Sequence, residues 1–260
     1  MSTRDGPVRR VVRLLDRIAA SEDPITVRSL ADGVDLPPST VHRLLQTLHD
    51  EGLVVREAER GRYAIGPSWY RISAQVVAKL DLPELARPHL EQVGDASGEA
   101  CVLGLYLPHE EAMTFVATHE SPHPLGYRLT LHDLLPLEWG ASGKAILAHL
   151  PEETQMRVVT GARTSPVTGQ QLDRDRLQRD LARVRTEGYL ISHGEKLPGA
   201  VGIAAPVFGV GGSVIASLCL TLPESRFDPD DAERLGELVR VGSRQLSRVL
   251  GGPDHTAETA

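Results

Sequence analysis

A short polar helix face near the N-terminus carries side chains that suit contacts with nucleic-acid bases and phosphates. Residues 38–48 place apolar side chains at the i, i+3, i+4, i+7 spacing that buries one stripe of a helix. The positions left facing solvent are Ser39, Thr40, His42, Arg43 and Gln46. Hydroxyl, guanidinium and carboxamide groups form hydrogen bonds with base edges in the major groove. The spacing therefore predicts a helix that reads DNA.

The elements before this helix must hold it in place. Helical periodicity predicts a first helix over residues 8–19 and a second over 27–34, with Thr26 as its N-cap. Pro37 and Pro38 predict the start of the third helix, because proline tolerates a first turn. Ser39 can accept a hydrogen bond from an unpaired amide there. Three helices sharing one core are typical of a helix-turn-helix domain.

A β-hairpin after the third helix completes a winged helix-turn-helix. The pattern predicts strands at residues 53–56 and 62–65. The bend between them brings Arg60 and Arg62 toward backbone phosphates or a minor groove. An ordinary amphipathic surface helix is the alternative for residues 38–48, but the flanking elements favour DNA binding.

The net charge bears on this interpretation. The 260 residues carry a formal charge of −7, which is unusual for a nucleic-acid binder. The first 66 residues balance ten arginines against ten acids, so the acidic excess lies in the remainder. Since phosphate contacts depend on the docking face, the local arginines can still bind DNA.

A second candidate site lies at the start of a helix in the other half of the chain. The run Trp139-Gly140-Ala141-Ser142-Gly143 precedes apolar helical positions, so small residues and free amides gather at a helix N-terminus. This arrangement predicts an anion site. The glycine cluster at 209–212 is different, because a strand follows it; it predicts a hairpin turn and not a phosphate loop.

The order of elements predicts an α+β protein with two domains. We expect a winged helix-turn-helix over residues 8–66, a linker helix over 67–81, a second domain over 82–250 and a disordered tail over 251–260. The second domain should have a central, mainly antiparallel sheet. Its expected strands are 99–107, 112–119, 127–131, 189–193, 202–208 and 214–222, and its expected helices are 82–94, 141–150, 152–160, 173–187 and 228–250.

Several classes of protein are disfavoured. No apolar run approaches the ~20 residues needed to span a bilayer, and the N-terminus lacks the apolar core of a secretory signal, so we expect a cytoplasmic protein without membrane contact. Ser142, His193 and Cys219 could form a nucleophilic site on paper, yet no catalytic signature supports them. We therefore expect no enzyme activity, no catalytic residue and no cofactor.

Cysteine and histidine usage leaves two alternatives. Cys101 and Cys219 lie in apolar, strand-like runs, which favours buried, reduced thiols; a redox-sensing pair is the alternative. His119, His123 and His132 could ligate a metal, but no CxxC or HExxH pattern accompanies them. We expect no metal site.

The chain resembles an IclR-type transcriptional regulator. The resemblance spans nearly the whole chain and rests on five segments in order: Val8-Arg9-Arg10, the run from Pro38 to Leu48, Arg62-Tyr63-Ala64-Ile65-Gly66, Leu135-Pro136-Leu137 with Gly143-Lys144-Ala145-Ile146-Leu147-Ala148, and Gly202-Ile203-Ala204-Ala205-Pro206-Val207-Phe208. It implies a GAF-like effector-binding domain, assembly as a homodimer or a dimer of dimers (a homotetramer), and control of a nearby operon by a small, often acidic metabolite.

The resemblance also implies where the effector binds. Its contacts fall on Trp139, Gly140, Ala141, Ser142, Ser192, Gly202, Cys219 and Thr221. Relatives carry an acidic residue at the position of Ser192 and a cysteine at that of Gly202. These two departures would enlarge the cavity and remove a charge.

Together these patterns predict a sequence-specific DNA-binding transcriptional regulator, with repressor or activator left open. Its partners would be a double-stranded operator, a small-molecule effector with a carboxylate, and a second copy of the chain. The alternatives are a ligand-independent or architectural DNA-binding protein, or a redox-sensing regulator that uses Cys101 and Cys219.

Overall fold

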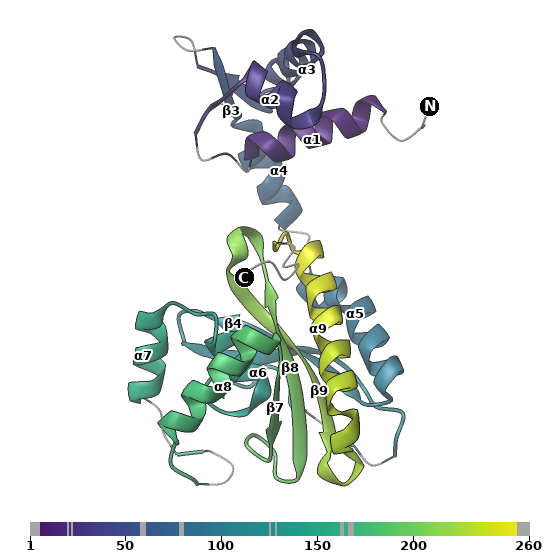
Figure 1. Cartoon of the computed structure of the whole chain (residues 1–260), viewed down its shortest axis with the longest axis vertical. Helices are drawn as coiled ribbons and strands as arrows, with labels where there is room; N and C mark the ends of the chain where they lie inside the picture. Colours follow the sequence, from purple (N-terminus) through teal and green to yellow (C-terminus); the bar gives the residue numbers. More distant parts are fainter. Residues whose placement is uncertain are drawn as a thin grey trace. The chain divides into compact units, whose positions relative to one another are not determined.

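The computed structural model describes residues 6–19, 21, 23–57, 61–77, 81–124, 126–127, 129–161, 164–165 and 169–253. The chain divides into two compact units, Met1–Leu80 and Asp81–Ala260, which we call the N-terminal and C-terminal units. As the sequence predicts, the protein mixes helices with antiparallel sheets in an α+β arrangement (Figure 1).

The N-terminal unit packs helices against a small sheet. Its elements are α1 (Pro7–Ala19), β1 (Ile25–Thr26), α2 (Val27–Val34), α3 (Pro38–Asp50), β2 (Val54–Arg56), β3 (Arg62–Ile65) and α4 (Ser68–Val77). The described strands pair antiparallel in the order β1-β3-β2. Leu14, Leu30, Leu45 and Tyr63 are fully buried between them. Apolar burial of this kind holds three short helices that would not be stable alone.

Local chemistry fixes the turns of this unit. The Thr26 hydroxyl accepts a hydrogen bond of 3.2 Å from the Ser29 amide, which confirms the predicted N-cap of α2. Asp35 ends α2 in the left-handed region, at φ 53°. The predicted capping role of Ser39 is wrong: Pro37 occupies the N-cap position of α3, and no side chain caps that helix. Pro38 in the first turn suffices because it has no amide to satisfy.

The end of the hairpin depends on Gly66. A Cβ atom at this position would lie 2.2 Å from the Gly52 carbonyl oxygen, so only glycine permits the two backbones to approach this closely. The Gly66 amide in turn donates a hydrogen bond of 2.9 Å to the Leu53 oxygen. This contact joins the end of β3 to the segment that follows α3.

The C-terminal unit is built on a second antiparallel sheet. Its elements are α5 (Leu82–Ser97), β4 (Ala100–Leu107), β5 (Ala112–His119), β6 (Leu135–Pro136), α6 (Gly140–Leu147), α7 (Glu152–Gly161), α8 (Arg174–Glu187), β7 (Leu190–His193), β8 (Ala200–Phe208), β9 (Val214–Pro223) and α9 (Ala232–Val249). Among the described residues the strand order is β6-β5-β4-β9-β8-β7. Helices α5 and α9 cover one face of the sheet, and α6, α7 and α8 lie on the other (Figure 1).

Alternation along the strands separates two apolar cores. Cys101 and Leu103 face α5 and α9, whereas their neighbour Val102 faces α6. Cys219 lies on the α6 side and pairs with Val102 across the strands. The two thiols therefore point to opposite faces and cannot form a disulfide, which corrects the redox-pair alternative. Burial also raises the pKa of both thiols, so they remain protonated.

One expected strand is wrong, and one observed strand was not predicted. The described residues of the 127–131 segment are irregular, and the outer partner of β5 is instead β6, through Ala112 and Met113. Strand β1 was not predicted, because two residues are too short to show alternation. The 209–212 cluster does join β8 to β9 through a short 3₁₀ turn, Val210–Gly212, as predicted.

The described residues contain neither a membrane-spanning helix nor a cluster of metal-binding side chains. No helix found there combines the length and apolar character needed to cross a membrane. Nor does the described part of the chain gather three or more His, Cys, Asp or Glu side chains in a way that could hold a metal ion. Of the three candidate histidines, His119 instead contacts the Asp95 carboxylate at 3.0 Å.

Candidate nucleic-acid interface and ligand cavity

Helix α3 presents a polar face to solvent. Val41, Leu45 and Leu48 are buried in the core of the N-terminal unit. The polar positions between them face outward: Ser39, His42, Arg43 and Gln46 are exposed, and Thr40 is half-buried. Gln46 Nε2 donates to Asp50 Oδ1 at 3.0 Å along the same helix. The face thus offers hydroxyl, imidazole and guanidinium groups at fixed positions.

The hairpin adds cations beside the helix-turn-helix. Arg56 on β2 is exposed and Arg62 on β3 is half-buried. Arg62 pairs in register with Thr26 of β1, and its carbonyl oxygen accepts a hydrogen bond of 2.9 Å from the Glu57 amide, which follows β2. Arg60 was predicted to contact DNA as well, but it lies outside the described residues.

The C-terminal unit contains a cavity of about 170 Å³ on the α6 side of its sheet. Its walls come from the start of α6, the loop after β7, strands β8 and β9, and the segment before α6. The lining residues are Phe115, Leu129, Thr130, Asp133, Leu135, Pro136, Gly140, Ala141, Ser142, Ser192, Glu195, Lys196, Leu197, Ala200, Gly202, Cys219 and Thr221. An apolar wall therefore encloses a few hydroxyls and charges, as in typical small-molecule sites.

The structure brings most of the predicted effector contacts together. Seven of the eight line the cavity: Gly140, Ala141, Ser142, Ser192, Gly202, Cys219 and Thr221. Trp139 does not; it is buried and lines a neighbouring depression with Glu138. Its backbone is the N-cap of α6, one residue before Gly140, the first residue of this helix to line the cavity.

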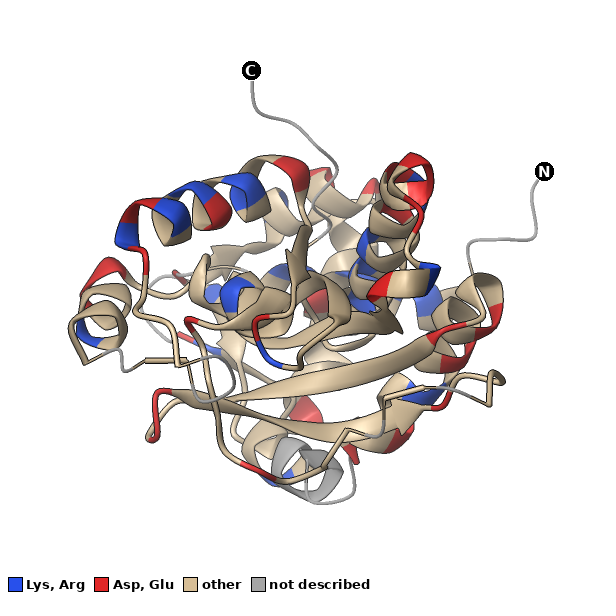
Figure 2. Ribbon diagram, turned by 90° about the horizontal axis from the view of Figure 1, so that it is seen from below, with Lys and Arg blue, Asp and Glu red and all other residues tan. Residues whose placement is uncertain are grey.

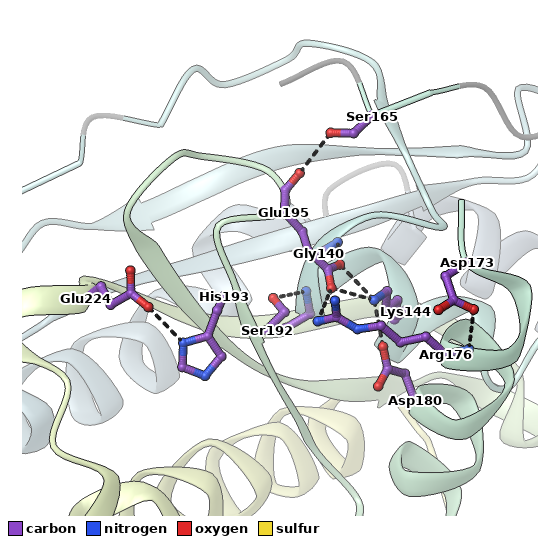
Figure 3. Close-up of polar contacts among 11 residues, drawn as sticks. Gly140, Lys144, Ser165, Asp173, Arg176, Asp180, Ser192, His193, Glu195 and Glu224 are labelled. Carbon is purple, nitrogen blue, oxygen red and sulfur yellow. Dashed lines mark hydrogen bonds and ion pairs between the residues drawn. The ribbon is translucent and has the colours of Figure 1, made fainter. Parts of the chain in front are cut away.

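The amides at the helix start are occupied by the chain itself. The Gly140 amide donates to Glu195 Oε2 at 2.8 Å, and the Ala141 amide donates to Ser192 Oγ at 2.8 Å (Figure 3). The expectation of free amides is therefore wrong at these two positions. The positive end of α6 is satisfied by an internal carboxylate, whose charge the helix dipole favours.

Glu195 is also the centre of a buried ionic network (Figure 3). Lys144 Nζ lies 2.7 Å from Glu195 Oε2 and 2.7 Å from Asp180 Oδ2 on α8. The Lys144 side chain is only 3% exposed. Arg176 adds a contact of 3.2 Å to Glu195 Oε1. These bonds tie α6 and α8 to the loop after β7.

Lys196, the next residue, faces a different environment. Its ammonium lies 3.1 Å from Met113 Sδ and 5.6 Å from the centre of the Phe115 ring. Burial lowers the pKa of Lys196 from 10.5 to about 8, although the neighbouring carboxylates of Glu138 and Glu195 oppose the shift. Sequence reasoning missed both Glu195 and Lys196. The only signal was two charged residues in a short turn between apolar strands.

Away from the cavity, the charged residues lie mainly on helices and loops. Figure 2 shows the broad strands almost free of charged residues, with both signs interspersed along the helices and loops. The cavity charges therefore belong to a local arrangement and not to a one-signed surface.

Both units match the domains of one family of known proteins. The IclR helix-turn-helix domain matches residues 7–58, and the bacterial transcriptional regulator IclR C-terminal domain matches residues 74–248. The chain is 31% identical to the HTH-type transcriptional regulator BhcR of Paracoccus denitrificans, over 92% of this chain and 85% of that protein. It is 30% identical to the HTH-type transcriptional repressor AllR of Klebsiella pneumoniae, over 94% and 89% respectively.

Solved structures share the fold of this chain. An IclR-type protein of Silicibacter sp. TM1040 shares the fold with a TM-score of 0.85 at 23% identity, covering 98% of this chain and 100% of that one. The IclR homologue of Microbacterium hydrocarbonoxydans, solved in complex with 4-hydroxybenzoate, has a TM-score of 0.56 at 26% identity, with 92% and 98% covered.

The helix-turn-helix unit and these relatives define the class of protein: it is a DNA-binding transcriptional regulator, and its relatives are regulators, not enzymes. The chain belongs to the IclR family.

Proposed function

We propose that this regulator represses transcription by binding an operator through α3 and the hairpin, and that a small molecule in the C-terminal cavity controls its operator affinity. The observation that carries the proposal is the cavity: a walled space with apolar, hydroxyl and cationic groups, in a unit that contributes nothing to the helix-turn-helix. A purely architectural DNA-binding protein would not need it.

The relatives support both halves of the proposal. AllR of Klebsiella pneumoniae is named a repressor, and the Microbacterium hydrocarbonoxydans homologue holds 4-hydroxybenzoate, a small organic acid. We assign operator reading to residues 8–66, a linking role to 67–81 and effector binding to 82–250. The DNA contacts we propose are Ser39, Thr40, His42, Arg43, Gln46, Arg60 and Arg62.

Control requires that the effector bind two states of the regulator with different affinity. A coupling free energy of about 1–3 kcal/mol is typical, and it changes operator affinity by the same factor as effector affinity. Helix α4 (Ser68–Val77) is the last described helix before the C-terminal unit in the sequence, so we propose it as the element that transmits the change.

We further propose that the regulator works as a homodimer or a dimer of dimers. Three large apolar side chains of the N-terminal unit are exposed to solvent: Val8 by 75%, Val12 by 49% and Tyr70 by 85%. Exposed apolar surface of this kind often marks a protein–protein contact. A symmetric contact would cover part of it and predict a near-palindromic operator. Light scattering at micromolar concentration should return at least twice the chain mass of 28.2 kDa; a single-chain mass would refute the assembly.

Gly202 gives the sharpest test of the effector site. A Cβ atom there would lie 3.4 Å from Ser192 Oγ and 3.6 Å from Ala141 Cβ, which is ordinary contact, so Gly202→Ala should fold and keep its effector response. Gly202→Phe would fill the cavity with a ring. We expect Gly202→Phe to bind operator DNA with unchanged affinity in gel-shift titrations but to lose release by the small molecule that releases the wild type.

The outcome separates the two functions. A folded Gly202→Phe variant that still responds with wild-type effector affinity would place the sensor elsewhere. Loss of operator binding in both Gly202 variants, with intact circular dichroism, would contradict the assignment of DNA reading to the N-terminal unit.

A further inference from the structure

We infer that an acidic effector places its carboxylate on the Lys196 ammonium and not at the start of α6, and that the other walls admit only a compact ligand with one carboxylate. This inference rests on the proposed function, since it concerns the same cavity. It makes Lys196 the residue that determines specificity for an acid.

The helix start is closed to a second anion. Glu195 already places a carboxylate 2.8 Å from the Gly140 amide, and Ser192 holds the Ala141 amide. An incoming carboxylate would have to displace these bonds. It would also approach the negative charge of Glu195, and like charges at such distances are unfavourable.

Lys196 lines the cavity and forms no ion pair with the described residues, although Glu138 and Glu195 act on its charge from a greater distance. The described part of the chain puts no carboxylate within ion-pair distance of its ammonium; its contacts are a thioether and an aromatic face. The carboxylate of neighbouring Glu195 is engaged by Lys144, Arg176 and the Gly140 amide. A desolvated cation in this position gains most from a ligand that brings the opposite charge.

The remaining walls set the size and polarity of the rest of the ligand. Phe115, Leu129, Leu135, Pro136 and Leu197 are apolar and face an enclosed volume of about 170 Å³. An apolar cavity of roughly 150 Å³ can hold a benzene molecule. A single ring or a short aliphatic chain therefore fits behind the carboxylate. A second carboxylate would meet Glu195 or Asp133 with no further lining cation, so a dicarboxylate is disfavoured.

Matched acids and amides test the inference. We would measure binding of benzoate, benzamide, hexanoate and hexanamide to the full chain by isothermal titration calorimetry at pH 7. Each amide has nearly the shape of its acid but no charge. The wild type should bind at least one acid, and bind it tenfold or more tightly than its amide. Lys196→Met should reduce this ratio to about threefold or less, and Lys196→Arg should keep most of it.

Arg174→Gln provides the matched control, because Arg174 is an exposed cation of the same unit that does not line the cavity. It should leave the acid-to-amide ratio unchanged. A ratio that survives Lys196→Met, equal affinity of the wild type for acids and amides, or no binding of any acid would each overturn the inference.

Failure of the inference is distinguishable from failure of the proposed function. If Lys196→Met keeps its preference for acids and operator release by the acid persists, the cavity remains the effector site while Lys196 loses its role. If Gly202→Phe responds to effector like the wild type, the cavity itself is excluded, whatever the result with Lys196.

Discussion

The proposed operator-reading face and the proposed effector cavity use polar side chains in different ways. On α3, Arg43 and His42 are exposed on a helix whose other side is packed into the core. In the cavity, Ser192 and Glu195 already make hydrogen bonds with the start of α6, so the chain's own groups occupy that end of the cavity. The two regions thus differ in how many of their polar groups the fold itself uses.

The largest expected effect would come from breaking the ionic network of the C-terminal unit. Lys144→Met keeps the buried aliphatic stem but leaves Glu195 and Asp180 as close carboxylates without their shared cation. We expect the free energy of unfolding to fall by about 3–5 kcal/mol, as for other buried pairs that lose one partner. Urea denaturation followed by circular dichroism would measure the change.

Lys196→Met is the matched control for this loss, because it removes a lysine charge from the same part of the fold. Lys196 is not held by a carboxylate, and burial already disfavours its charge. Stability should therefore be nearly unchanged. Equal destabilisation by the two lysine substitutions would show that the cavity cation is structural, and the contrast between them would disappear.

The next largest effect concerns the proposed DNA contacts of α3. Arg43→Ala should weaken specific operator binding by about 1–3 kcal/mol, because an arginine on an exposed recognition face contributes a bidentate contact to a base. Gel-shift titration at fixed salt would measure it, with Arg71→Ala on α4 as a control for the loss of an exposed charge. Unchanged operator affinity in Arg43→Ala would mean that α3 does not read the operator.

A smaller effect follows from the pKa of Lys196, about 8 in the free protein. A bound carboxylate favours the protonated amine and raises this pKa, so acid affinity should be constant at pH 6–7. It should fall up to tenfold per unit as the pH rises above 8. The other titratable groups around the amine are Glu138, Glu195, Asp133 and Cys219.

Calorimetry of benzoate and benzamide between pH 6 and 9.5 would separate the contributions. Only the acid should lose affinity at high pH, and only when Lys196 is present. An identical pH profile in Lys196→Met would assign the titration to one of the four neighbouring groups.

The smallest effect is expected at the hairpin. Arg62→Ala should weaken operator and unrelated DNA alike and lower the slope of log affinity against log salt by about 1, since a phosphate contact carries no sequence information. Filter binding at several salt concentrations would measure the slope. A selective loss for the operator would instead make Arg62 a base contact.

The sequence predicts the exposed face of α3 far better than it predicts the cavity of the C-terminal unit, and the reason is physical. Burial of Val41 and Leu45 is a matter of helical period, so the exposed positions of α3 follow from spacing alone. In the C-terminal unit, Lys144 meets Glu195 at a sequence separation of 51 residues, and Lys196 meets Met113 at a separation of 83. Contacts of this range depend on the assembled sheet, and no local pattern encodes them.

The fold was predictable to a similar extent. The second hairpin strand, Arg62–Ile65, has the predicted bounds, since alternation and a glycine turn define it. The expected strand at 127–131 failed because the edge of β5 pairs with only two residues of β6. Neither a two-residue strand nor the absence of a pairing partner leaves a periodic signal in the sequence.

Helix α6 has an implication for how this regulator can diverge. All its residues from Gly140 to Leu147 are buried, and a Cβ atom on Gly143 would lie 2.5 Å from the Leu137 oxygen. A library of random substitutions in α6 should therefore yield few folded proteins. The partly exposed turn that carries Lys196 and Leu197 is under no such constraint. Single codon changes there can alter ligand preference while leaving the packing of the helix behind the cavity intact.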